Sequence, residues 1–302
     1  MEKRILVTGA SGLVGRHLVA VLQQKGYEVN TLGRGSKGPA GARHFTWDVD
    51  AGVIDTESLS GVSAIIHLAG AGIAEKRWTS SRRQEILDSR VKSADLLFKQ
   101  LQGQPHEVKT FISASAVGYY GDCGDETITE ERGPSDGFLA EVCVKWEQAA
   151  KKFTTLGLRE VRCRIGIVLA KEGGALPELT KSLPFGVAPY FAKSTLVYPW
   201  IHIEDVCGIF VHALENDAVK GAINTNAPHP AKMKELMQAI LKAKKSKAIL
   251  MPVLPFAIQL AMGEMSDMVL ESQRCNPWKI INSGYKFRFN KVEAALKDIY
   301  GK

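Results

Sequence analysis

Three glycines near the N-terminus are spaced for binding the phosphates of a dinucleotide. Gly9, Gly12 and Gly15 follow the apolar run Arg4–Thr8 and open an amphipathic stretch that stops at Gly26. In such a strand–turn–helix the first glycine permits a tight turn, the second lets a pyrophosphate approach the backbone, and the third lets helix and strand pack closely. The phosphates then meet free N–H groups at the positive end of the helix dipole. A purely structural turn is the alternative, but the position between a strand and a helix favours a dinucleotide site.

The end of the second predicted strand indicates which dinucleotide binds. An NAD-selective site places an acid there for the ribose 2′-hydroxyl. Here the strand Glu28–Leu32 is followed by Gly33 and Arg34, and no acid competes at the tip. The guanidinium of Arg34 is a fork of donors that suits a 2′-phosphate. We therefore predict NADP(H), with a surface arginine that binds no ligand as the alternative.

The elements that must position these residues alternate through the first two-thirds of the chain. Predicted strands and helices lie at Arg4–Thr8, Gly12–Lys25, Glu28–Leu32, Ala64–Ala69, about Ser80–Gln100, Thr110–Ser113, about Phe138–Phe153 and Glu160–Ile165. Repeated strand–helix–strand order predicts an α/β fold, a Rossmann-type doubly wound parallel sheet, with a small C-terminal α+β lobe. We expect an NADP-binding domain at 1–170, re-entered by about 196–228, and a small substrate-side lobe at 171–195 and 229–302.

Composition narrows the function classes. The net charge of +7 is scattered, and the densest basic run, 242–247, is typical of a solvated helix end, so we expect no nucleic-acid partner. No apolar run approaches the roughly 18 residues of a membrane span, so we expect no membrane partner. Five cysteines without a C-x-x-C pair, and no secretory leader, predict reduced thiols in the cytoplasm. The histidines show no metal spacing, so we expect no metal, and the oligomeric state is left open.

Longer stretches carry a family resemblance. They are Ile66–Gly70, Lys76–Thr79, Ser89–Arg90, Ser113–Gly121, Phe138–Cys143, Lys145–Glu147, Arg164–Leu169, Trp200–Asp205 and Ser272–Arg274. Together they resemble the extended short-chain dehydrogenase/reductase superfamily, and within it the atypical "epimerase family" branch, which is NAD-dependent epimerase/dehydratase-like and related to bacterial proteins labelled cell-division inhibitors. One departure is the stretch 186–199, which replaces a glycine-rich segment of many relatives and is expected to border the substrate pocket.

The resemblance also implies a set of cofactor contacts. They are Gly9, Ser11, Gly12, Leu13, Val14, Gly33, Arg34, Asp48, Leu68, Ala69, Glu85, Arg90 and Val168. Asp48 is expected near the adenine amine, and Glu85 and Arg90 are expected to face the cofactor from a helix. For Leu68 and Val168, buried packing at a strand end is the alternative.

The tyrosine–lysine pair that typical members use for proton transfer is missing. None of the seven tyrosines is followed by a lysine four positions later. Alignment on Glu147 puts Leu139 at the tyrosine position and Cys143 at the lysine position. Losing a general acid–base group typically costs about a hundred- to ten-thousand-fold in rate.

Two other side chains are the candidates for catalysis. Ser115 aligns with the catalytic serine of the superfamily, and Tyr120 or its neighbour Tyr119 is a candidate substitute acid, with packing or turn roles as the alternative. We therefore expect an NADP(H)-binding oxidoreductase or epimerase of an undetermined small polar substrate. The alternative is a non-catalytic NADP(H)-binding regulatory or sensor protein.

Overall fold

Contacts between residues divide the chain into two units. The computed structural model describes residues 4–193 and 195–301. The first unit comprises Met1–Ser115, Val142–Cys163 and Cys207–Ile223. The second unit comprises Ala116–Glu141, Arg164–Val206 and Asn224–Lys302. The division runs through the expected range 1–170, because the chain leaves the sheet at Ala116 and returns to it with the helix that contains Val142.

An eight-stranded sheet forms the centre of the first unit, in the order β14-β8-β6-β5-β1-β2-β3-β4. Its strands are β1 (Arg4–Thr8), β2 (Glu28–Gly33), β3 (Arg43–Asp48), β4 (Val53–Ile54), β5 (Val62–His67), β6 (Thr110–Ala116), β8 (Arg159–Ile165) and β14 (Gly221–Thr225). The pairs β1–β2, β1–β5, β2–β3 and β5–β6 are parallel, and β4 is antiparallel to β3. The predicted doubly wound α/β sheet is confirmed.

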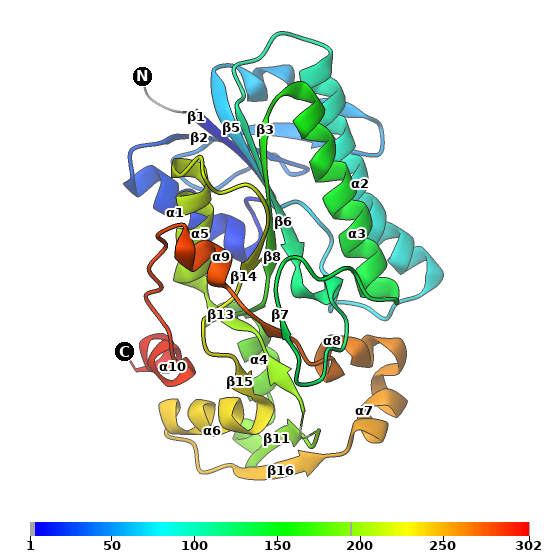
Figure 1. Ribbon diagram of the computed structural model, residues 1–302, viewed down its shortest axis with the longest axis vertical. Coiled ribbons are helices and arrows are strands. Elements are labelled where there is room, and N and C mark those ends of the chain that lie inside the picture. Colours follow the sequence, from blue (N-terminus) through cyan, green and yellow to red (C-terminus); the bar gives the residue numbers. More distant parts are fainter. Residues whose placement is uncertain (1–3, 194, 302) are drawn as a thin grey trace. The chain divides into compact units, whose positions relative to one another are not determined.

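Helices cover both faces of this sheet, as Figure 1 shows. On one face lie α1 (Leu13–Gln24) and α5 (Ile203–Glu215), and on the other α2 (Ser80–Gln102) and α3 (Phe138–Lys151). Burial of Leu18, Val19 and Leu22 confirms the predicted apolar face of α1. Between α2, α3 and the sheet, the rings of Phe111 and Phe153 stack with centroids 3.6 Å apart. This packing holds the segment that follows α3 against β6.

The second unit combines short strands with short helices. Its strands are β7 (Thr127–Ile128), β9 (Ile167–Ala170), β10 (Gly173–Gly174), β11 (Val187–Phe191), β12 (Val197–Tyr198), β13 (Trp200–His202), β15 (Ala231–Lys232), β16 (Ile249–Val253) and β17 (Arg274–Cys275). Its helices are α4 (Ala175–Thr180), α6 (Met233–Ala243), α7 (Pro255–Met262), α8 (Asp267–Leu270), α9 (Trp278–Asn282) and α10 (Val292–Tyr300). The stretch 186–199 supplies β11, which pairs in parallel with β16, and β12, which pairs with β15.

Candidate dinucleotide-binding site

The turn between β1 and α1 needs two of its three glycines for its own geometry. Gly9 has a positive φ of 67°, and a Cβ there would lie 2.5 Å from the carbonyl oxygen of Leu68. A Cβ on Gly15 would overlap the Gly9 carbonyl and the backbone of Ala10. Gly9 therefore lets the turn lie against the end of β5, and Gly15 lets α1 pack on the turn.

Gly12 is different, because the protein itself makes little demand on it. Its φ is −73°, an ordinary value, and a Cβ there would meet only the Gly9 carbonyl oxygen, at 3.3 Å. Gly12 is the N-cap of α1, with no side-chain cap and no acidic residue in the first turn. The helix start thus offers backbone N–H groups and a positive dipole end to an anion. The predicted contacts Ser11, Leu13 and Val14 lie in this turn and the first helical turn.

A histidine that the sequence did not single out holds the loop after β2. His44 Nδ1 and Thr31 Oγ1 are 2.9 Å apart, and His44 Nε2 lies 2.8 Å from the Gly35 carbonyl oxygen. Gly33 packs against the same imidazole, since a Cβ there would lie 3.2 Å from His44 Cε1. Arg34 between them is exposed. A rigid loop therefore carries the guanidinium predicted to bind a 2′-phosphate.

Asp48 lies at the end of β3 and has a local structural role. Its Oδ1 accepts hydrogen bonds from the backbone N–H groups of Asp50, at 3.1 Å, and Ala51, at 3.0 Å. This turn holds the carboxylate at the same edge of the sheet as the loop after β2. Its contact with an adenine amine stays a prediction.

Leu68 and Ala69 are held at the end of β5 by hydrogen bonds to β1. The N–H of Leu68 donates to the Thr8 carbonyl at 3.2 Å, and the N–H of Ala69 donates to Thr8 Oγ1 at 3.3 Å. His67 beside them is buried between Thr8 Oγ1, at 2.8 Å, and Ser93 Oγ, at 3.2 Å. Burial lowers the pKa of His67 to about 4, so this imidazole is neutral at neutral pH. The His67 side chain thereby helps to hold the carboxyl ends of β1 and β5 together.

The two predicted residues of α2 have different environments. Glu85 is exposed, and the hydrogen bond from Arg82, 2.7 Å away, lowers the pKa of its carboxyl. Arg90 is buried, with Nη1 donating to the Ile86 carbonyl at 2.8 Å and Nε without a hydrogen-bond partner. Burial lowers the pKa of Arg90 to about 10, which still leaves it charged at neutral pH. Within residues 4–193 and 195–301 no carboxylate forms an ion pair with it, so this cation can receive an external anion.

The hydroxyl group of Ser115 donates a hydrogen bond to a buried carboxylate. Its Oγ lies 2.8 Å from Glu147 Oε1, and Arg162 Nη1 lies 3.0 Å from Glu147 Oε2. Arg162 Nε is in turn 2.8 Å from a carboxylate oxygen of Glu160. Sequence reasoning missed this network. The available signal was Glu160 and Arg162 at alternate positions of a strand predicted to be covered by helices.

The second unit holds Tyr120, whose hydroxyl is fully engaged. It donates to Asn224 Oδ1 at 2.7 Å and accepts from Arg164 Nη1 at 2.8 Å. The side chain is 0% exposed, and burial raises the pKa of Tyr120 above its ordinary value. These contacts favour the packing role that the sequence left open. Tyr119 is half-buried, with Arg164 Cζ 3.7 Å from its ring centroid.

Val168 also lies in the second unit, on β9. It is half-buried and pairs with Ile201 of β13 in a parallel register. Its contact with a cofactor stays a prediction.

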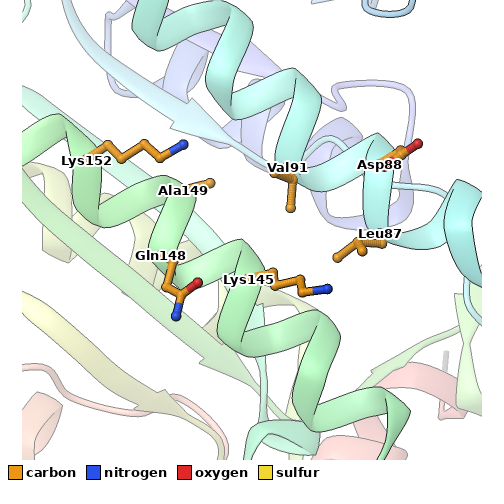
Figure 2. A pocket seen from close by; sticks show the side chains of 7 residues that line it. All are labelled: Leu87, Asp88, Val91, Lys145, Gln148, Ala149 and Lys152. Carbon is orange, nitrogen blue, oxygen red and sulfur yellow. The ribbon is translucent and has the colours of Figure 1, made fainter.

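A surface pocket lies between α2 and α3, away from the turn that carries the glycines. Its volume is about 180 Å³, and its lining is Leu87, Asp88, Val91, Lys145, Gln148, Ala149 and Lys152. Figure 2 shows Leu87 and Val91 pointing from α2 toward α3, with Lys145 extending across toward them. Two of its charged groups are already paired, Asp88 with Lys92 at 2.9 Å and Lys152 with Asp95 at 2.6 Å. The pocket shares no lining residue with the glycine turn or with the predicted cofactor contacts.

Two kinds of feature are absent from the described part of the chain, a metal-binding cluster and a membrane-spanning helix. Within that part, no group of three or more His, Cys, Asp or Glu side chains is placed to hold a metal ion. Nor does it contain a helix long and apolar enough to cross a membrane.

Two segments of the chain match known protein families. Residues 5–140 match the NAD dependent epimerase/dehydratase family. Residues 255–299 match a domain of unknown function (DUF1731).

Relatives match the chain over nearly its whole length. The epimerase family protein YfhF of Bacillus subtilis is 33% identical over 298 residues, covering 98% of this chain and 97% of that protein. The epimerase family protein SDR39U1 homolog, chloroplastic, of Arabidopsis thaliana is 33% identical over 306 residues, covering 99% of this chain and 87% of that protein. The resemblance seen in the sequence is thus found along the entire chain.

Solved structures match as well. The crystal structure of human epimerase family protein SDR39U1 (isoform 2) with NADPH has a TM-score of 0.87 at 30% identity and covers 99% of each chain. The nucleoside-diphosphate sugar epimerase of Corynebacterium glutamicum has a TM-score of 0.79 at 32% identity, covering 100% of this chain and 59% of that chain. Similarity at this level of identity and coverage extends through both units. The chain therefore belongs to the epimerase family of atypical short-chain dehydrogenases/reductases.

Proposed function

We propose that this protein binds NADP(H) and acts as an oxidoreductase or epimerase on a small polar substrate. The observation that carries the cofactor proposal is Gly12. Its φ does not require glycine, and a Cβ there would meet a single atom, the Gly9 carbonyl oxygen, at a close 3.3 Å, yet this residue caps a helix whose first turn has no side-chain cap. A glycine in that place serves the close approach of a pyrophosphate to backbone N–H groups.

Two cations support the choice of an anionic cofactor with a 2′-phosphate. Arg34 follows β2 on a loop fixed by His44, and Arg90 is a buried guanidinium with which no carboxylate of residues 4–193 and 195–301 forms an ion pair. A buried charge without a partner is costly unless a ligand compensates it. The human relative whose structure contains NADPH is 30% identical to this chain over 99% of its length, which also supports NADP(H).

NADP(H), when bound, supplies hydride transfer, and the chain must supply proton transfer. Ser115 presents only its lone pairs to a substrate while its proton is donated to Glu147. Tyr119 is half-buried, whereas the hydroxyl of its neighbour Tyr120 is fully buried between Asn224 and Arg164. We therefore propose Ser115 as a hydrogen-bond acceptor and Tyr119, ahead of Tyr120, as the substitute acid.

A non-catalytic cofactor-binding protein is the second candidate. It is favoured by the hydroxyl groups of Ser115 and Tyr120, both of which donate to protein groups instead of standing free. In that case NADP(H) occupancy would order a surface read by a partner.

Titration separates these proposals. Purified protein is titrated with NADPH and NADH by fluorescence, then mixed with NADPH or NADP and panels of sugar nucleotides and carbonyl compounds. Tight NADPH binding supports the cofactor proposal, and absence of binding at millimolar concentration refutes it. Turnover is supported by an absorbance change at 340 nm for an oxidoreductase, or by chromatographic conversion of a sugar nucleotide into its epimer without net change at 340 nm for an epimerase, if Tyr119→Phe abolishes it. Binding without conversion of any panel compound supports the second candidate.

The state of the cysteines indicates the kind of cellular compartment in which this function would operate. All five are buried thiols without a disulfide in the described part of the chain, which suits a reducing compartment such as the cytoplasm. We propose a small-molecule substrate and neither nucleic acid nor membrane as partner.

A further inference from the structure

The two-stranded ribbon of β11 and β16, in the second unit, is apolar on both of its faces. Ala188 of β11 is 0% exposed and belongs to the core of the second unit. Side chains alternate between the two faces of a strand, so the face opposite to Ala188 carries the odd-numbered residues. These are Val187, Pro189 and Phe191 of β11 and Ile249, Met251 and Val253 of β16. A sheet face that meets water usually carries polar side chains, whereas this one carries none.

The exposed apolar surface continues from the ribbon into the neighbouring elements. The backbone N–H of Ile249 donates to the Gly186 carbonyl at 2.9 Å, which places Phe185, the residue before Gly186, near the start of β16. α7 follows β16 directly (Figure 1), and of its eight residues only Ile258 is buried. Six large side chains of this region are between 49% and 86% exposed, and we call them the apolar face: Phe185, Ile249, Met251, Leu254, Phe256 and Leu260.

The area of the apolar face approaches that of one side of a stable dimer. At these exposed fractions, with about 170 Å² for each large apolar side chain, the six residues expose roughly 700 Å². The largest apolar patch on a typical monomer is about 300–600 Å². A stable interface buries about 800 Å² on each partner. The apolar face is therefore large enough to be covered by another protein surface.

The edge of β16 is less suited to a partner than the face. In the two-stranded sheet, one edge of β16 is paired with no strand of residues 4–193 and 195–301. Because the N–H of Ile249 bonds toward β11, the backbone groups of Leu250 and Pro252 point to the other edge. Proline has no N–H to donate, and its presence protects an edge against the addition of a strand. A partner is therefore expected to pack against side chains and not to extend the ribbon.

Opposite charges lie at the two ends of the apolar face. Exposed Lys245 and Lys247 precede its stretch on β16 and α7, and exposed Glu264 and Asp267 follow that stretch. A second copy turned antiparallel about a twofold axis brings the basic end of each copy to the acidic end of the other. An interface between identical patches must be self-complementary in this way. An anionic membrane, by contrast, would attract the basic end and repel the acidic end.

We propose that the apolar face is the interface of a homodimer, in which two copies of this chain meet antiparallel about a twofold axis. The six apolar side chains pack against those of the second copy. Lys245 and Lys247 of each copy face Glu264 and Asp267 of the other. The interface contains none of the predicted cofactor contacts, so this inference does not depend on the proposed NADP(H) binding.

The first test measures the mass of the full chain in solution. We expect light scattering after size-exclusion chromatography at about 50 μM to give twice the 33.0 kDa of one chain, with dissociation on dilution. Leu260 and Phe185 are 86% and 84% exposed, so an aspartate at either position does not enter the core of one chain. Leu260→Asp and Phe185→Asp are each expected to raise the dimer dissociation constant at least about thirtyfold, because each buries a charge in the interface. Trp278→Asp changes a 58% exposed side chain outside the apolar face, and this matched control is expected to leave the constant unchanged.

Charge reversal tests whether the partner is a second copy. The double variant Lys245→Glu, Lys247→Glu makes both ends of the apolar face acidic, and the double variant Glu264→Lys, Asp267→Lys makes both ends basic. Each is expected to dimerise at least about tenfold more weakly than wild type, because like charges then meet across the twofold axis. An equimolar mixture of the two is expected to form a heterodimer in native mass spectrometry. Together with a dimeric wild type, this result requires the basic end of one copy to face the acidic end of the other.

Other occupants of the apolar face give other results. Wild type that stays monomeric up to about 200 μM overturns the proposal. So does a dimer whose dissociation constant is the same in Leu260→Asp and Phe185→Asp, provided that circular dichroism shows both variants folded. Monomeric wild type that floats with phosphatidylserine vesicles would identify a membrane as the occupant and would also overturn the proposal.

Discussion

Replacement of Gly12 by alanine tests whether the glycine turn serves a ligand. The substitution adds one methyl group at a position with φ of −73°, where its Cβ would meet only the Gly9 carbonyl oxygen, at 3.3 Å. Gly9→Ala is the matched control. There φ is +67° and the Cβ would lie 2.5 Å from a backbone oxygen of another strand end. The first change is therefore directed at the ligand and the second at the fold.

The expected magnitudes differ between the two variants. An alanine instead of glycine at an N-cap lowers the free energy of unfolding by about 1 kcal/mol or less. A left-handed alanine costs about 1–2 kcal/mol before any overlap with Leu68 is counted. For binding, the methyl at residue 12 holds a pyrophosphate away from the N–H groups. Loss of one charge-assisted hydrogen bond, worth about 1.5–3 kcal/mol, raises the NADPH dissociation constant about 10- to 150-fold.

Two measurements on each variant are sufficient. Fluorescence titration gives the NADPH dissociation constant, and thermal or urea unfolding without ligand gives stability. We expect Gly12→Ala to lose affinity with little loss of stability, and Gly9→Ala to lose stability. If Gly12→Ala binds NADPH within threefold of wild type, or unfolds as readily as Gly9→Ala, the assignment of this glycine to the ligand is wrong.

Three further predictions concern specificity, a buried network and pH. Arg34→Ala is expected to raise the dissociation constant for NADPH at least about tenfold and that for NADH less than threefold, because only NADPH carries the 2′-phosphate; equal losses in parallel titrations contradict the role. Glu147→Gln weakens the bonds from Ser115 and Arg162, so urea unfolding should show about 1–3 kcal/mol lower stability, and an unchanged midpoint would count against the network. Burial raises the pKa of Glu271 to about 7 from an ordinary value of 4.5. Ionisation of Glu271 therefore destabilises the folded chain increasingly as pH rises from 4.5 to about 7. After allowance for partial exposure, Glu271→Gln should be more stable than wild type by about 1–2 kcal/mol at pH 8 and equal to it at pH 4. A stability difference that does not change with pH refutes this prediction.

Local patterns predicted most of the first unit. β1 matches its expected bounds, and α1 and α2 match theirs within two residues, because apolar periodicity and glycine stops are properties of neighbouring residues. β3 was not predicted. Its sequence from Arg43 to Asp48 alternates exposed and buried residues near the edge of the sheet, without the continuous apolar run of a central strand.

The candidate site was predictable only where it is local. The glycine turn and Arg34 belong to short segments whose geometry follows from residue types. The partner of Ser115 is Glu147, and the residue that holds the Arg34 loop is His44, and both contacts depend on tertiary packing. The paired charges on β8 were visible in the sequence, but their role required knowing which helix covers that strand.

The same distinction bears on why this chain would keep its cofactor while losing the usual catalytic pair. Phosphate binding uses backbone N–H groups of one turn, which any side chain outside that turn leaves intact. Proton transfer needs a phenol and a cation brought together by spacing on α3, and here Leu139 and Cys143 occupy both positions. Arg90 lies beside Cys143 and provides a cation from another helix without restoring the phenol. A site built in this way binds NADP(H) by the means that the superfamily uses, but its proton donor must come from a position other than 139 and 143. The Tyr119 variant tests whether that donor is Tyr119.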